Sequence, residues 1–174
     1  MQNLPVLFVV FLKFLIPTFL LKFPFYASWS NYFLDVVDGD ILRSLGMGEY
    51  PYQMIDKLAD FYSYFFMMFL GLRFRIKNTV VILFIYRAVG QILFFLTRNE
   101  LVFFYFQNFL EPLIMTYTLL LFKLKSEKKA YKTYKNYLKL IWGIIFAYKI
   151  WNEWTLHFAN VDLSKKFLGF TGGE

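Results

Sequence analysis

The chain has 174 residues, 59% of them hydrophobic and 24% aromatic, and this composition exceeds the range of soluble domains. The absence of cysteine excludes a disulfide framework, and a single histidine, His157, excludes a histidine-rich metal site. The net charge of +7 is better explained by the cytoplasmic loops of a membrane protein than by nucleic acid, so we expect no nucleic-acid partner. We expect one membrane-embedded domain over residues 1–174.

The first predicted element is an apolar run at residues 4–22. Its length is about that needed to cross a hydrocarbon core of roughly 30 Å, and we expect a membrane helix bent near Pro17. A cleaved signal peptide is the alternative. It is disfavoured because Lys13 interrupts the apolar run, no basic side chain precedes it and no A-x-A site follows.

Further helical segments follow along the chain. The segment 25–45 either crosses the membrane or lies at its interface, because its charged residues gather in its second half. The remaining spans are predicted at residues 53–72, 78–96, 101–122 and 137–156. The sequence therefore predicts an all-α integral membrane protein, a bundle of five or six transmembrane helices, in a prokaryotic cell membrane.

Four aspartates lie at the centre of the predicted chemistry. Asp35 and Asp38 are three residues apart, and Asp56 and Asp60 are four apart, so each pair lies on one face of a helix. If the two faces meet, they form an all-oxygen pocket. Such a pocket suits Mg²⁺ or Mn²⁺, and Mg²⁺ usually shares its ligand shell with substrate phosphates and water.

Two neighbouring residues suit a phosphate ligand. Gly39 removes a side chain where a ligand could approach the backbone, and Arg43 offers a planar fork for phosphate oxygens. With these residues, the spacing D-x2-D-G-x2-L-R-x8-Y-x3-D-x3-D resembles the motif of the CDP-alcohol phosphatidyltransferase family. That motif is usually D-x2-D-G-x2-A-R-x8-G-x3-D-x3-D, so Leu42 and Tyr52 replace a small Ala and a Gly.

The resemblance, which covers residues 35–60, implies a transferase of phospholipid biosynthesis. Its metal ligands would be Asp35, Asp38, Asp56 and Asp60, which would hold Mg²⁺ or Mn²⁺ against the diphosphate of a CDP-linked donor. Asp60 would also be the base that acts on the acceptor alcohol. The implied partners are membrane lipid and a nucleotide-linked lipid donor, and a homodimer is left open. Because Leu42 and Tyr52 depart from the motif near the nucleotide, the resemblance supports a metal-diphosphate site better than a cytidine pocket.

Two other classes of protein compete with this interpretation. One is a non-catalytic membrane protein that binds a lipid head group or a partner through the same acidic pocket. The other is a transporter or channel component, which is disfavoured because the sequence offers no pair of discontinuous helices. Acidic residues also gather in loops between spans for solubility alone, and in that case the aspartates would form no site.

The distribution of basic residues conflicts with the topology of the family. The loops at 73–77 and 123–139 lie on one predicted side and are rich in Lys and Arg, which indicates the cytoplasm. The acidic motif then lies outside, whereas the family's site faces the cytoplasm. Either the charge rule fails here, or the donor differs, or the chain has lost the reaction.

Charged residues also lie within two predicted spans. Arg87 is in the span 78–96, and Glu111 is in the middle of the span 101–122. A charge at membrane depth usually faces the bundle interior with a partner, so we expect Arg87 and Glu111 to pair. The pair would either fix the helix register or face a substrate.

Overall fold

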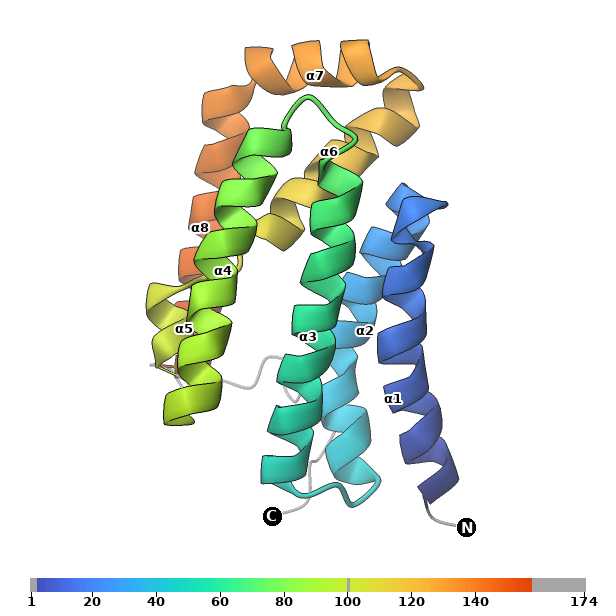
Figure 1. Ribbon diagram of the computed structural model, residues 1–174, viewed down its shortest axis with the longest axis vertical. Coiled ribbons are helices and arrows are strands. Elements are labelled where there is room, and N and C mark those ends of the chain that lie inside the picture. Colours follow the sequence, from blue (N-terminus) through green and yellow to red (C-terminus); the bar gives the residue numbers. More distant parts are fainter. Residues whose placement is uncertain (1–2, 100, 158–174) are drawn as a thin grey trace.

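Helices make up the regular structure of residues 3–99 and 101–157, which the computed structural model describes (Figure 1). The predicted all-α class is therefore confirmed for these residues. Residues 1–2, 100 and 158–174 of the predicted single domain lie outside the described part. The elements are α1 (Asn3–Thr18), the 3-10 helix η1 (Phe19–Leu21), α2 (Pro24–Ser44), α3 (Glu49–Gly71), α4 (Lys77–Thr97), α5 (Val102–Tyr105), α6 (Leu110–Leu124), α7 (Glu127–Asn136) and α8 (Leu138–His157).

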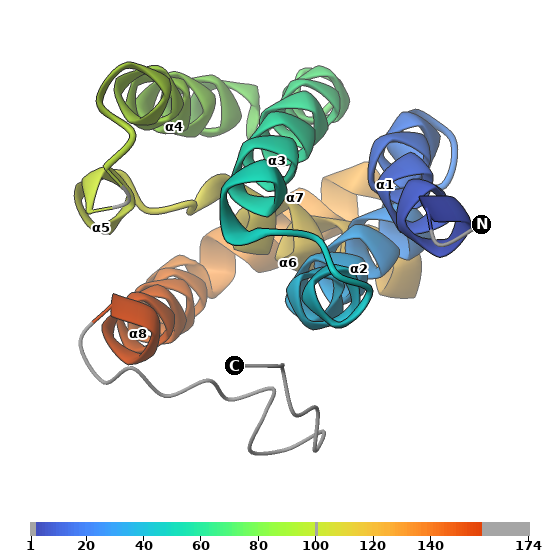
Figure 2. The ribbon, with the colours of Figure 1, turned by 90° about the horizontal axis from the view of Figure 1, so that it is seen from below.

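The first three helices form one group within the bundle. α1 packs against both α2 and α3, and these three helices lie side by side (Figures 1 and 2). α4 packs on α3, α6 packs on α2, and α7 lies across one end of the bundle. Side chains that point inward from α1, α2 and α3 therefore meet in one place.

Backbone features define both ends of α2 and the turn that leads from it to α3. Pro24 begins α2 at a position where its missing N–H costs no helical hydrogen bond. At the other end, Gly46 has φ of 88°, a conformation that glycine adopts without steric cost. The Met47 N–H donates to the Leu42 carbonyl at 3.0 Å and the Gly46 N–H donates to the Arg43 carbonyl at 2.9 Å, the Schellman pattern. The short connection that follows makes α2 and α3 antiparallel neighbours.

The apolar core is formed mainly by α3 and α6, with contributions from η1, α2, α4, α7 and α8. Tyr117 of α6 is fully buried, and its hydroxyl donates to Glu127 at the start of α7 at 2.8 Å. The segment after α6, predicted as a lysine-rich linker, is thus an ordered helix whose Tyr134 packs against the core. Other buried members of the core are Leu20, Ala27, Tyr64, Met67, Leu70, Ile76, Val80, Leu110, Leu113, Ile114 and Ile145.

The outer surfaces of several helices are apolar. In α4, for example, Ile82, Ile85 and Leu96 are exposed by 66%, 56% and 77%. By length and composition, two stretches among the described residues are able to cross a membrane, Leu4–Leu21 and Lys77–Thr97. These stretches suggest that the protein associates with a membrane.

The prediction of one continuous helix over residues 101–122 is wrong, because the chain there forms α5, a short irregular segment and α6. Tertiary contacts replace helical hydrogen bonds in that segment. The Arg87 guanidinium donates to the Phe106 carbonyl at 2.6 Å, and the Asn108 side chain accepts from the Glu111 N–H at 3.2 Å. Glu111 consequently lies in the first turn of α6 rather than in the middle of a helix.

The contact between α4 and this irregular segment generates a prediction about stability. A Cβ on Gly90 would lie 2.3 Å from the Cβ of Phe106, which no side-chain rotation relieves. We expect Gly90→Ala to destabilise the protein by about 1–3 kcal/mol, the usual range for overpacking. Gly143→Ala in α8 is the matched control, since a Cβ there meets nothing within 4 Å and alanine favours a helix by up to about 1 kcal/mol. Thermal unfolding in detergent measures both, and equal midpoints would contradict the close approach.

Candidate metal centre

The carboxylates of α2 and α3 face one another across the hairpin. Asp35 and Asp38 project from α2, and Asp56 and Asp60 project from α3. Ligand oxygens of Asp35, Asp38 and Asp56 all lie within 4.8 Å of one another. Asp38 is fully buried and Asp56 is 5% exposed. The structure thus brings together three of the four predicted metal ligands, and their oxygen atoms are of the kind that Mg²⁺ and Mn²⁺ bind.

A lysine from α1 lies among these three carboxylates. The ammonium nitrogen of Lys13 lies 3.4 Å from an oxygen of Asp35 and also forms ion pairs with Asp38 and Asp56. Lys13 is 5% exposed, and its pairs with Asp38 and Asp56 are buried, whereas the pair with Asp35 is partly exposed. The sequence drew attention to Lys13 only as an interruption of an apolar run. A charge in the middle of such a run is nevertheless a signal, because it is costly unless a partner neutralises it.

A second lysine contacts the same group of carboxylates. Lys57 forms an ion pair with Asp56 at 2.6 Å and approaches Asp60 to 4.0 Å. We call the four aspartates with Lys13 and Lys57 the aspartate cluster. Its four carboxylates and two ammonium groups leave a formal excess of two negative charges. One oxygen of Asp38, Oδ1, is buried and accepts no hydrogen bond from the described part of the chain. The cluster as a whole therefore has the charge and the donor atoms to accept a divalent cation.

The two predicted phosphate-binding residues, Gly39 and Arg43, lie beside Tyr52. A Cβ on Gly39 would come within 2.7 Å of the Tyr52 hydroxyl oxygen, so glycine makes room for this phenol. Arg43 pairs with Glu49 at 2.8 Å, and its guanidinium carbon lies 4.8 Å from the centre of the Tyr52 ring. Leu42 is fully buried. Tyr52 thus fills the space next to Gly39, and Arg43 already has a carboxylate partner.

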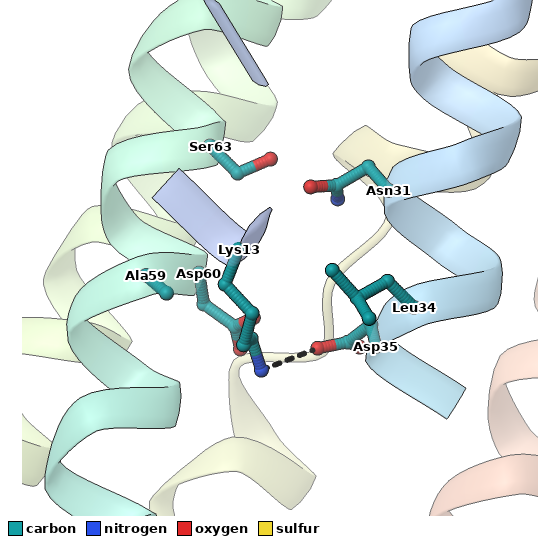
Figure 3. A pocket seen from close by; sticks show the side chains of 7 residues that line it. All are labelled: Lys13, Asn31, Leu34, Asp35, Ala59, Asp60 and Ser63. Carbon is teal, nitrogen blue, oxygen red and sulfur yellow. Dashed lines mark hydrogen bonds and ion pairs between the residues drawn. The ribbon is translucent and has the colours of Figure 1, made fainter. Parts of the chain in front are cut away.

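A pocket opens next to the aspartate cluster. Its lining residues are Lys13, Asn31, Leu34, Asp35, Ala59, Asp60 and Ser63 (Figure 3). The side chains of Asn31 and Ser63 point toward each other across it, from α2 and α3 respectively. Ser63 is 2% exposed, and its hydroxyl has no hydrogen-bond partner among the described residues. The pocket therefore offers a buried polar group that is free to bind.

A chain of hydrogen bonds runs from Asp60 toward α6. The Tyr64 hydroxyl donates to Asp60 at 3.3 Å and accepts from the Asn108 amide at 3.2 Å. The same amide donates to Glu111 at 3.3 Å, and Asn31 donates to the other oxygen of Glu111 at 3.4 Å. The sequence pattern does not predict this network, because its members come from four separate segments. The network therefore reaches Oδ2 of Asp60, the same oxygen that Lys57 approaches.

Arg87 and Gln91 of α4 contact the neighbouring segments of the aspartate cluster. The Arg87 guanidinium lies over the ring of Phe103, 4.2 Å from the ring centre, and it also donates to the Phe106 carbonyl. Gln91, one turn later in α4, donates to the Lys57 carbonyl at 2.6 Å. α4 therefore holds the segment of α3 that carries Lys57 and Asp60. The predicted pairing of Arg87 with Glu111 stays a prediction.

Comparisons of the chain with protein-family models, with curated proteins and with solved structures found no match in any of the three. The resemblance of residues 35–60 to the CDP-alcohol phosphatidyltransferase motif stays a prediction.

The Tyr64 hydroxyl links Asp60 to Asn108, and a single substitution removes it without changing the ring. Tyr64→Phe removes the hydrogen bond to the buried Asp60 carboxylate and one of the two acceptors of the Asn108 amide, and we expect a loss of about 1–3 kcal/mol in the free energy of unfolding. Tyr62→Phe is the matched control on the same helix, because the described part of the chain gives its hydroxyl no hydrogen bond, and it should change stability by less than about 0.5 kcal/mol. Chemical denaturation of both variants measures the difference. Equal losses would show that the network contributes nothing.

Proposed function

We propose that the chain is an integral membrane protein with five spans, formed by α1, α3, α4, α5 with α6, and α8, or six if α2 also crosses. The two apolar stretches in α1 and α4 support this proposal, and so do the large apolar side chains exposed on α8, such as Leu140, Ile144 and Ile150. α6 alone has 15 residues, about 22 Å of helix, which is short for a membrane crossing. The irregular segment before it fits the rule that non-helical backbone at membrane depth is covered by protein.

We propose that the aspartate cluster catalyses transfer of a substituted phosphate from a CDP-linked donor to an alcohol. The observation that supports this most is the convergence of carboxylates from Asp35, Asp38 and Asp56 within 4.8 Å. Oxygen ligands in this number suit a divalent cation that shares its shell with a diphosphate. A cation bound there would neutralise the donor and stabilise the charge that develops on the departing nucleotide.

In the proposed reaction, Asp60 accepts the proton of the acceptor hydroxyl. The acceptor oxygen then forms a bond to the donor phosphorus, the bond within the diphosphate breaks, and the nucleotide monophosphate leaves with the electron pair. Asp60 lines the pocket with Asn31 and Ser63, so an acceptor hydroxyl in this pocket would lie within reach of the carboxylate. The bond from Tyr64 would hold that carboxylate in place.

The donor has less room than the family motif implies. Tyr52 replaces the Gly of the motif and lies against Gly39, and Leu42 replaces a small Ala and is fully buried. These two side chains would crowd a base placed beside the motif. The aspartate cluster therefore supports binding of the diphosphate of the CDP-linked donor better than binding of its cytosine base.

A non-catalytic membrane protein is the second candidate. The observation that favours it is Lys13, whose ammonium pairs with three of the predicted metal ligands. If this ammonium never leaves, the cluster is a structural network, and any ligand would bind outside it. The two candidates differ in whether the protein turns over a donor.

The proposed base gives the direct test of catalysis. We expect Asp60→Asn to lower turnover by at least about 100-fold, the usual lower bound for loss of a general base, while Mn²⁺ binding persists. Asp40→Asn is the control, since Asp40 lies in the same stretch of α2 but at a variable position of the motif, and it should retain activity. Release of CMP from a CDP-linked lipid, measured in detergent micelles with Mg²⁺, reports turnover. An Asp60→Asn protein with full activity would exclude this role.

A further inference from the structure

We propose that the Lys13 ammonium occupies the position of the divalent cation and that binding of the cation moves it into the neighbouring pocket. The inference rests on the proposed metal site and adds a residue that determines its affinity. It is carried by two separate observations, the ion pairs of Lys13 and the unpartnered hydroxyl of Ser63.

Geometry excludes two cations among the same three carboxylates. The Lys13 nitrogen is paired with Asp35, Asp38 and Asp56, whose ligand oxygens all lie within 4.8 Å of one another. A Mg²⁺ ion would lie about 2 Å from its oxygen ligands, and it would therefore fall in the space that the ammonium occupies. Two positive charges so close in a buried site repel strongly. One of the two cations must leave.

Charge favours the divalent ion. With both lysines in place, the aspartate cluster keeps a formal excess of two negative charges. A divalent ion supplies two positive charges where Lys13 supplies one, and it binds several carboxylate oxygens at shorter distances than an ammonium does. Displacement is therefore favourable at sufficient metal concentration, provided that the ammonium finds another partner. An ammonium buried without one would oppose metal binding.

The pocket supplies that partner. Lys13 itself lines the pocket, together with Asp35, Asp60 and Ser63. The side chains of Ser63 and Asn31 point into it from opposite walls (Figure 3). The Ser63 hydroxyl is buried and accepts no hydrogen bond from the described residues, and an ammonium brings three donors. Rotation about the bonds of the lysine side chain moves the ammonium without moving α1.

Mn²⁺ affinity of the purified full-length protein tests this directly, measured by electron paramagnetic resonance without any substrate. Lys13→Met should bind Mn²⁺ at least about tenfold more tightly than the unaltered protein, because the competing cation is gone. Lys149→Met is the matched control. It removes another buried lysine, 6% exposed and on α8, and it should change the affinity less than twofold. Equal affinities for the unaltered protein and Lys13→Met would overturn the proposal.

A second variant tests the role of Ser63. Ser63→Ala removes the hydroxyl that would receive the displaced Lys13 ammonium. It should therefore weaken Mn²⁺ binding about threefold or more in the unaltered background. In the Lys13→Met background it should have no effect. An unchanged Mn²⁺ affinity in the unaltered background, or equal effects in both backgrounds, would overturn the displacement. Ser63→Ala leaves all ion pairs intact, so it serves even if Lys13→Met does not fold, and circular dichroism and gel filtration check the folding of each variant.

The outcomes separate this inference from the proposed reaction. Mn²⁺ binding that tightens in Lys13→Met, in a protein with no transferase activity, would support the inference and contradict the reaction. Transferase activity together with a Mn²⁺ affinity that does not depend on Lys13 would contradict the inference alone. If none of the variants binds Mn²⁺, the metal site itself is wrong and both proposals fall.

Discussion

Burial of carboxylates between α2 and α3, above all those of Asp38 and Asp56, is the constraint on which the rest of the structure depends. Ionised groups removed from water are unfavourable unless opposite charges and hydrogen bonds compensate them. Lys13 and Lys57 supply part of this compensation from α1 and α3. The need for a cation explains why an otherwise apolar helix carries a lysine in its middle, and why α1 packs against both helices that bear the aspartates.

The remaining elements hold the cluster in position. The irregular segment between α5 and α6 places Asn108 and Glu111 where they connect, through Tyr64, to Asp60. Gln91 of α4 donates to the Lys57 carbonyl and so holds the part of α3 that carries Asp60. The basic helix α7 lies at the opposite end of the bundle from the turn between α2 and α3 (Figure 1). The cluster therefore sits nearer the end that carries fewer basic residues.

Much of the architecture could be predicted from the sequence, because apolar runs of helical length leave little freedom. The run 78–96 corresponds closely to α4, and the run 137–156 corresponds to α8. The break before α6 was harder to predict, since it also depends on contacts that Phe106 makes with α4. Asn108 and Pro112 were local signals for a helix start there, but the apolar residues around them favoured one long helix.

The candidate site was predictable in part, because helix geometry determines which residues share a face. The spacing of the aspartates indicated which helix faces they share, and the four-residue turn made those faces meet. The position of Lys13 depends on how α1 packs, which no spacing within residues 35–60 encodes. Tyr52 likewise stood out as a departure from a motif, yet only the fold shows that its hydroxyl lies against Gly39.

A crystal structure of the protein grown with Mn²⁺, with data collected at a wavelength where manganese scatters anomalously, would test the central claim most directly. We predict one anomalous peak about 2 Å from oxygens of Asp35, Asp38 and Asp56, with the Lys13 nitrogen moved toward Ser63. A Lys13 ammonium still paired with the three carboxylates, and no anomalous peak among them at saturating Mn²⁺, would contradict it.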